Sequence, residues 1–319
     1  MVRCHGNPPR GVSRPSGGPQ ATDGPLIRGM STTMCSQRRW AMGMFMATHP
    51  YPAAIYGVAG LLTFLIVSHG GSRSTAMLLF IAIWLIQASI GAMNDYVDEA
   101  GDRLGNPDKP LVQGVVSKTQ ILLLSFLCGS LGVALAAVLG GGAPMALLIL
   151  AAGMAYNFAL KGTVLSWLPY AVHIPSVAVW AFIAAGLSSP LLLLTYPVGA
   201  GIAVALNLAD AIPDLDGDAR PGQSGLARRL GVRGSKTVIV LLYVATGAMM
   251  AAVGFWAGLP SLGAASLTLA IGAGIVLAVL FTYGSPVSLR IGWHASAIAA
   301  VLFAGCWALT LERLLKLDF

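Results

Sequence analysis

Charged side chains are scarce in this sequence. They make up 10% of its 319 residues, and only 12 of them are acidic. A soluble domain needs a polar side on each of its surface helices, and a chain that is 56% hydrophobic cannot supply those sides. In their place the sequence has repeated apolar runs of about 20 residues, the length that crosses a bilayer as a helix. The sequence therefore predicts an all-α fold, a polytopic transmembrane helical bundle of about nine helices.

Cysteine and histidine are also few, and neither forms a recognisable pattern. The four cysteines have no CxxC or other ligand spacing, and the five histidines do not cluster along the chain. We therefore do not expect zinc, and we interpret the cysteines as incidental. Residues 1–42 are rich in Gly, Pro, Ser and Arg and lack the apolar core of a secretory signal peptide, so we expect a disordered tail before a membrane domain at 43–319.

The basic residues follow the topology of the expected spans. We place these spans at about 46–68, 75–94, 119–139, 143–160, 167–187, 190–209, 237–257, 263–282 and 291–311. Ten Lys or Arg residues lie in the longer connections on one side, against one in the short loops on the other. The positive-inside rule puts the N-terminus and the longer connections in the cytoplasm and the C-terminus outside, in an inner-membrane protein. The net charge of +7 thus reflects topology, and we expect no nucleic-acid partner.

Nine of the 12 acidic residues gather in two short stretches, which we call the first acidic island (94–110) and the second acidic island (210–218). A charge inside a bilayer costs about 2.5–3.5 kcal/mol, so acids placed against membrane helices usually serve a function. The two islands match at a constant offset, which relates Asn94, Asp98 and Asp102 to Asp210, Asp214 and Asp218. We therefore expect parallel pseudo-repeats at about 45–165 and 166–285, a ninth helix at 291–311, and one site built from both halves.

The spacing within each island predicts its chemistry. Asn94, Asp98 and Asp102 stand at i, i+4 and i+8, which places them on one face of a helix, and Asp214 and Asp218 repeat the i, i+4 spacing. Carboxylate and amide oxygens suit Mg2+, which favours one or two carboxylates together with phosphate oxygens of a substrate. Lys and Arg residues follow each island and would complement the remaining phosphate oxygens. The pattern indicates a magnesium–diphosphate site with these five residues as metal ligands.

The same residues resemble the signatures of the UbiA superfamily of intramembrane prenyltransferases. The first island fits an NxxxDxxxD signature and the second a DxxxD signature. The segments NPDKPLVQGVVS (106–117), YNFALK (156–161) and GDARPGQSGLARRLG (217–231) are similar to family segments, and the likeness covers about residues 45–311. Two departures stand out. Lys109 occupies a position where many members have Arg, and the sequence before the first span lacks the usual Arg-Pro.

The resemblance implies a nine-helix bundle with its active site at the cytoplasmic mouth of a central cavity. It implies transfer of a prenyl group from an isoprenyl diphosphate to an acceptor, which we expect to be lipophilic and either aromatic or a quinone precursor, with Mg2+ on the diphosphate. The catalytic residues it implies are Asp98, Asp102, Asp214 and Asp218. The diphosphate-binding residues it implies are Asn94, Arg103, Lys109, Tyr156 and Lys161.

Other functions fit parts of the sequence. A membrane terpene cyclase on the same scaffold would need the same residues to ionise a diphosphate. A cation transporter would use acidic residues as well, but transporters more often hold them near the middle of the membrane, whereas both islands lie at expected helix ends. Tyr156 and Lys161 are also residue types that anchor helices at a membrane interface.

Overall fold

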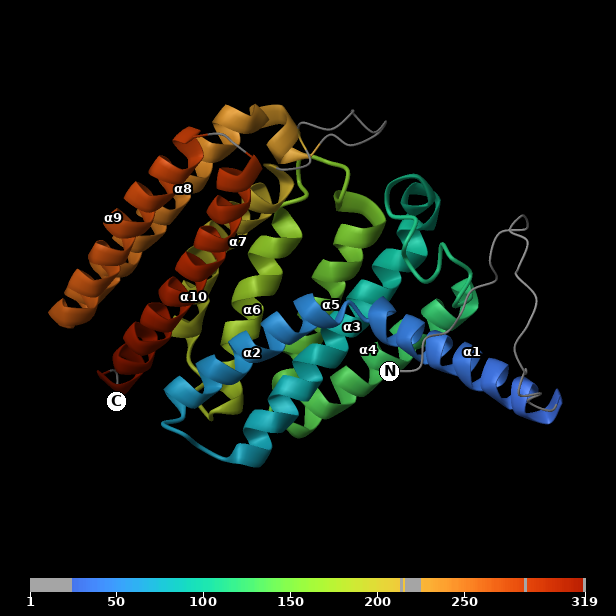
Figure 1. Ribbon diagram of the computed structural model, residues 1–319. Helices are drawn as coiled ribbons and strands as arrows, with labels where there is room; N and C mark the ends of the chain where they lie inside the picture. The colour runs from blue at the N-terminus through green and yellow to red at the C-terminus, as the bar shows by residue number, and fades with distance from the viewer. Residues whose placement is uncertain (1–24, 213–214, 216–224, 284–285, 318–319) are drawn as a thin grey trace, which may run out of the picture.

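The structure of the protein, a computed structural model, describes residues 25–212, 215, 225–283 and 286–317. Every regular element in these ranges is helical (Figure 1). In chain order the elements are α1 (Pro25–Ala47), α2 (Pro50–Val67), α3 (Arg73–Gly105), α4 (Lys118–Val138), α5 (Gly142–Ala155), the π-helix η1 (Tyr156–Leu160), α6 (Leu168–Ala184), the 3-10 helix η2 (Pro190–Leu194), α7 (Thr195–Ala211), α8 (Leu226–Trp256), α9 (Pro260–Tyr283) and α10 (Pro286–Leu317).

The predicted transmembrane bundle is confirmed. Eight helical segments in the described part of the chain are long and apolar enough to cross a membrane. The span expected at 167–187 is α6, an apolar helix of 17 residues that contains Pro175. Each of the nine expected spans therefore corresponds to a helix, and the protein is a multi-pass membrane protein.

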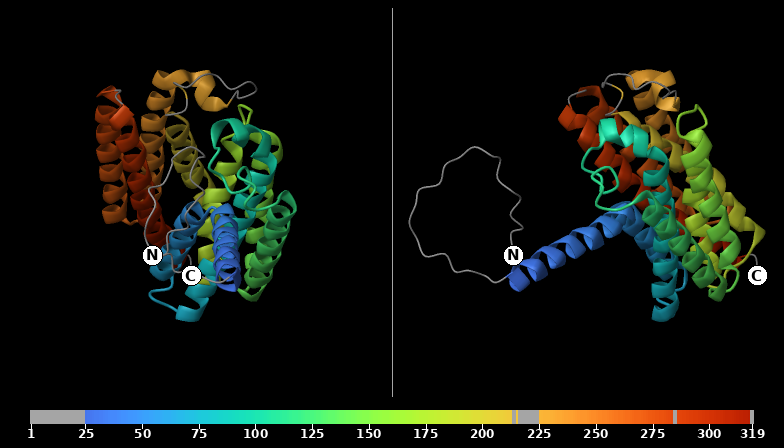
Figure 2. Two further views of the ribbon diagram at one scale, coloured as in Figure 1. Left: turned by 45° about the vertical axis from the view of Figure 1, so that its right-hand side comes forward. Right: turned by 90° about the vertical axis from the view of Figure 1, so that its right-hand side faces the viewer.

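The N-terminal segment contains a helix. Helix α1 begins at Pro25 and runs to Ala47, so part of it lies within the segment 1–42 for which a disordered tail is expected, while residues 1–24 lie outside the described ranges. The boundary between tail and membrane domain stays a prediction. The prolines of the tail stop at Pro25 and none follows until Pro50, so no proline interrupts a helix between them. Helix α1 projects from the side of the bundle and joins it only through its C-terminal end (Figure 2).

Helix α3 lies at the centre of the N-terminal half, where it packs against α2, α4, α5 and α6. A close approach between α3 and α4 depends on Gly132, because a Cβ at that position would lie 2.9 Å from Ile86 Cδ1. Helix α4 begins with a capping box in which Ser117 and Gln120 each bond the backbone N–H of the other. The packing of α3 against its neighbours positions the C-terminal end of α3, which carries the first acidic island.

Two large apolar clusters form the core, one around α2 to α6 and one around α7 to α10. The C-terminal end of α3 and the chain ends on either side of the second acidic island lie at the same end of the bundle, and the C-terminus lies at the other (Figure 1). Asp214, Asp216 and Asp218 are outside the described residues. The internal repeat, with halves at about 45–165 and 166–285, therefore stays a prediction.

Candidate active site

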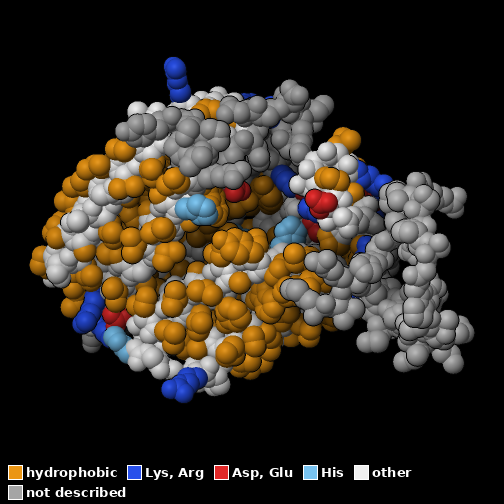
Figure 3. Space-filling model, in the orientation of Figure 1, with side chains coloured by type: hydrophobic (Ala, Val, Ile, Leu, Met, Phe, Trp, Pro, Cys, Tyr) orange, Lys and Arg blue, Asp and Glu red, His pale blue; other side chains and the backbone are white. Residues whose placement is uncertain are grey.

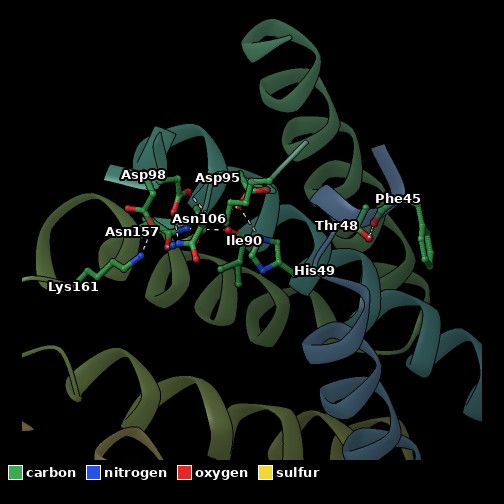
Figure 4. A network of polar contacts seen from close by, with 12 residues as sticks. Phe45, Thr48, His49, Ile90, Asp95, Asp98, Asn106, Asn157 and Lys161 are labelled. Carbon is green, nitrogen blue, oxygen red and sulfur yellow. Dashed lines mark hydrogen bonds and ion pairs between the residues drawn. The ribbon is translucent and has the colours of Figure 1, made fainter. Parts of the chain in front are cut away.

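The first acidic island continues α3 as an unbroken helix to Gly105, so the i, i+4, i+8 set shares one face. Each member contacts a different partner. Asn94 Nδ2 donates to Asn157 Oδ1 at 3.2 Å, and Lys161 Nζ donates to Asp98 Oδ2. Figure 4 shows Lys161 extending toward Asp98 and His49 toward Asp95. The structure thus brings Asn94, Asp98 and Lys161 together, as the resemblance implied.

Lys109 bridges two buried carboxylates. Its Nζ lies 2.7 Å from Asp102 Oδ2 and 2.7 Å from Asp95 Oδ1, and these acids are only 6% and 3% exposed. Burial opposes the positive charge, but the hydrogen bonds and charges of Asp102 and Asp95 outweigh it and raise the pKa of Lys109. Asn106 Nδ2 donates to Asp102 Oδ1 at 2.8 Å, so both oxygens of Asp102 have donors.

Lys109 is placed by the segment between α3 and α4, which packs against the end of α1. The small apolar cluster under this segment includes Leu111 and Val116, together with Ala47 of α1 and Ala92 of α3. Lys109, four residues beyond the end of α3, is thereby turned back toward that helix. Its ammonium group reaches Asp95 and Asp102.

His49 and Asp95 belong to this network, although the sequence analysis did not select either residue. His49 Nε2 lies 2.9 Å from Asp95 Oδ1, and His49 has a left-handed backbone with φ 49° in the turn between α1 and α2. Asp95 stands one position from Asn94, off the predicted face, so helical spacing does not point to it. His49 is 46 residues away along the chain, and it lies inside the first expected span without any motif that connects it to the island.

Gly91 makes room for His49, and this contact can be tested. A Cβ on Gly91 would lie 2.9 Å from His49 Cβ, so we expect Gly91→Ala to displace the imidazole from Asp95 and to lower the thermal stability of the purified protein. The matched control is Gly101→Ala on the same helix, where an added Cβ meets nothing within 4 Å. That change should stabilise α3 by about 0.5–1 kcal/mol through helix propensity. Equal melting temperatures for the two variants would contradict the prediction.

Arg103 lies apart from the other predicted residues. Its guanidinium Nη2 donates to Glu99 Oε1 at 2.8 Å, and Lys118 Nζ pairs with Glu99 Oε2 at 3.0 Å and lies over the ring of Tyr96. Glu99 and Arg103 stand one position along from Asp98 and Asp102, which turns them to a neighbouring face of α3. Arg103 is therefore a predicted diphosphate-binding residue whose contact in the structure is with Glu99, which is not one of the predicted metal ligands.

The π-helix η1 also contributes residues to the site. Asn157 is buried, accepts from Asn94 and donates to the carbonyl of Ile90 at 2.9 Å, so it ties η1 to α3. Tyr156 meets Tyr170 edge to face at 5.2 Å, and the charges of Asp98 and Asp210 both act on its phenol. Asp210, at the end of α7, belongs to the second acidic island. Tyr156 therefore lies within electrostatic reach of both islands.

The described donor atoms are compatible with an Mg2+ site to which both islands contribute. No three His, Cys, Asp or Glu side chains among the described residues come close enough to hold a metal. The face of α3 offers carboxylate and amide oxygens, which are the right ligand type for Mg2+. Asp214 and Asp218, the remaining predicted ligands, lie outside the described ranges. A site that takes one or two carboxylates from each island and phosphate oxygens from the substrate is compatible with this arrangement.

The surface is hollowed beside these groups. In the view of Figure 3 a depression opens near the middle of a largely hydrophobic face, with acidic, basic and histidine side chains at its rim. An apolar molecule with a charged end could enter from the membrane side and present that end to the rim. The surroundings thus match a substrate that combines a diphosphate with a hydrocarbon tail.

Comparison with known proteins identifies the family of the chain. The family model described as the UbiA prenyltransferase family matches residues 53–290. Digeranylgeranylglyceryl phosphate synthase of Methanoregula boonei is 29% identical over 285 residues, which are 82% of this chain and 98% of that protein. A UbiA homolog from Archaeoglobus fulgidus, solved with GPP and Mg2+, has a TM-score of 0.66 at 17% identity and covers 84% of this chain and 99% of its own. A UbiA homolog from Aeropyrum pernix K1 has a TM-score of 0.64 at 20% identity and covers 80% and 97%.

These solved structures share the fold, and the family match covers both acidic islands and the helices that carry them. The prediction of an enzyme of the prenyltransferase class, made against a cation transporter, is confirmed. This chain belongs to the UbiA prenyltransferase family.

Proposed function

We propose that the protein transfers a prenyl group from an isoprenyl diphosphate, bound with Mg2+, to a lipophilic acceptor. The observation that carries the proposal is the pairing of each acidic residue on one face of α3 with a lysine. Lys161 pairs with Asp98, and Lys109 pairs with Asp102. Carboxylates for a metal and ammonium groups for phosphate oxygens thus lie side by side, as a metal-bound diphosphate requires.

The proposed role of each residue follows from its chemistry. Asn94, Asp98 and Asp102, with Asp214 and Asp218 of the second acidic island, would hold the metal, and Lys109 and Lys161 would bind the diphosphate oxygens. A bound Mg2+ would neutralise charge on the leaving diphosphate. The two ammonium groups stabilise the same charge as the bond between carbon and oxygen breaks. The surrounding apolar helices keep water from the allylic carbon.

The acceptor is the part of the function on which sequence and comparison differ. We expected an aromatic or quinone-precursor ring, and that expectation stays a prediction. The names of the curated relatives support another acceptor, because the product in those names, digeranylgeranylglyceryl phosphate, carries geranylgeranyl groups on a glyceryl phosphate. We propose a hydroxyl group of a prenylated glyceryl phosphate as the acceptor, with an aromatic ring as the alternative.

We further propose that the site faces the cytoplasm of a cell with an inner membrane. The excess of Lys and Arg in the longer connections supports this orientation. The placement of both island-bearing helix ends at the end of the bundle opposite the C-terminus is consistent with it (Figure 1). Labelling of single cysteines introduced near Gly101 and near the C-terminus, from each side of a sealed vesicle, would test the assignment.

The experiment that tests the function is release of pyrophosphate by the purified protein in lipid. We expect release from geranylgeranyl diphosphate to require Mg2+ together with either geranylgeranylglyceryl phosphate or one member of an aromatic panel. Release that needs metal but no acceptor, with a cyclic hydrocarbon product, would instead identify a terpene cyclase. No release with any chain length or acceptor would contradict the proposal.

A further inference from the structure

Two polar side chains lie deep among the apolar helices, away from the charged rim. Gln87 of α3 and His173 of α6 are 7% and 8% exposed, and their Nε2 atoms form a hydrogen bond. A polar group in a membrane bundle is costly, and it usually serves either to join helices or to form a functional site. The surroundings of this pair distinguish the two roles.

Gln87 continues the face of α3 that carries the predicted metal ligands. It precedes Asn94 by seven residues and Asp98 by eleven, which returns it to nearly the same direction around the helix. The rise of an α-helix places Gln87 about 10 Å further into the bundle than Asn94. The polar face of α3 therefore extends inward from the diphosphate site.

Aromatic rings occupy the interval between the pair and the two acidic islands. Tyr56 of α2 packs on His173 with ring centroids 4.8 Å apart, and Tyr170 stands three residues before His173 on α6. Tyr170 in turn meets Tyr156 of η1 edge to face, with ring centroids 5.2 Å apart. All three tyrosines are only partly buried although they lie within the bundle. The rings of these tyrosines thus lie between the Gln87–His173 pair and the charged groups of the site.

We propose that Gln87, His173 and Tyr56 form the recognition site for the reacting hydroxyl group of the acceptor. The site offers neutral hydrogen-bonding groups and no charged side chain of its own, so it suits a hydroxyl better than a phosphate. It lies inward of the diphosphate site, on the side where the allylic carbon of a bound prenyl diphosphate enters the apolar bundle. This inference rests on the proposed function and specifies which residues select its second substrate.

The test compares the KM for each substrate in Gln87→Leu and His173→Leu. We expect the KM for the acceptor to rise about tenfold or more, the loss that follows when a buried hydrogen bond to a substrate is removed. The KM for geranylgeranyl diphosphate should stay within about twofold, because Asp98 and the lysines are untouched. His173→Asn keeps a side chain that can hydrogen-bond, and it should recover part of the acceptor affinity.

Ser125→Ala is the matched control. Ser125 Oγ donates to the carbonyl of Ser89 at 2.8 Å, so it joins α4 to α3 through an equally buried polar contact outside this site. Its KM values should both equal those of the wild type. Tyr56→Phe keeps the ring on His173 and removes the hydroxyl, so a selective rise in the acceptor KM there tests the site without loss of packing.

Three results would overturn the inference. Unchanged acceptor KM in Gln87→Leu and Tyr56→Phe would show that the site does not bind the acceptor. A parallel rise of both KM values, with a lower melting temperature, would assign Gln87 and His173 to helix joining alone. A wild-type protein that binds geranylgeranyl diphosphate with Mg2+ but transfers it to no hydroxyl acceptor would also overturn it. A wild-type protein that binds no isoprenyl diphosphate would refute the proposed function itself.

Discussion

Asp98→Asn is expected to lower the rate of prenyl transfer about 100- to 1,000-fold, the range seen when one group that stabilises a charged transition state is removed. Asp98 is the central residue of the polar face on α3 and forms an ion pair with Lys161. The amide keeps the size of the side chain but removes the charge that would hold the metal and orient the lysine. Pyrophosphate release in lipid, measured across a range of Mg2+ concentrations, checks the prediction.

Glu99→Gln provides the control for Asp98→Asn. It removes one negative charge from the adjacent position, where Glu99 pairs with Arg103 and Lys118 on a neighbouring face of the helix. Activity should remain near that of the wild type, since ion pairs whose basic partners are exposed to solvent, as Arg103 and Lys118 are, contribute little. If both variants lose activity to the same extent, the charge of the region and not the position of Asp98 would be responsible. Unchanged release in Asp98→Asn would remove that residue from the proposed site.

Lys109→Met is expected to damage both stability and diphosphate binding. It leaves Asp95 and Asp102 buried without the ammonium that they share, and removal of one partner of a buried ion pair typically costs about 3–5 kcal/mol. The expected result is a large fall in the melting temperature of the detergent-purified protein and weaker binding of geranylgeranyl diphosphate with Mg2+. Lys109→Arg keeps the charge and should retain most of the stability.

The contribution of Lys109 has a definite pH dependence. Because its pKa is raised above its ordinary value of 10.5, the stabilisation is fully present below that value and is lost as the pH rises through the folded-state pKa. The difference in melting temperature between wild type and Lys109→Met should therefore be constant from neutral pH to about pH 9 and shrink above pH 10.5. A difference that grows with rising pH would contradict the assigned ion pairs.

Much of the site could be predicted because its signals are local. The spacing of Asn94, Asp98 and Asp102 on α3 follows from helical periodicity alone. Lys161 was selected from a family-like segment, and the structure places it on Asp98, 63 residues away in sequence. The role of Arg103 stays a prediction, because Arg103 is next to Asp102 in sequence but pairs with Glu99 on a neighbouring face of the helix.

The sequence by itself determined the class of protein, the positions of the apolar helices, the shared face of α3 and the family. These depend on composition and on short-range periodicity, and both can be read from short stretches of the sequence. Only the tertiary structure decided that His49 meets Asp95, that Lys109 joins Asp95 to Asp102, and that Gln87 meets His173. Gln87 and His173 are 86 residues apart, and their contact depends on how α3 and α6 pack in three dimensions. Helical periodicity fixes the direction of a side chain around its own helix, whereas packing fixes which helix it faces.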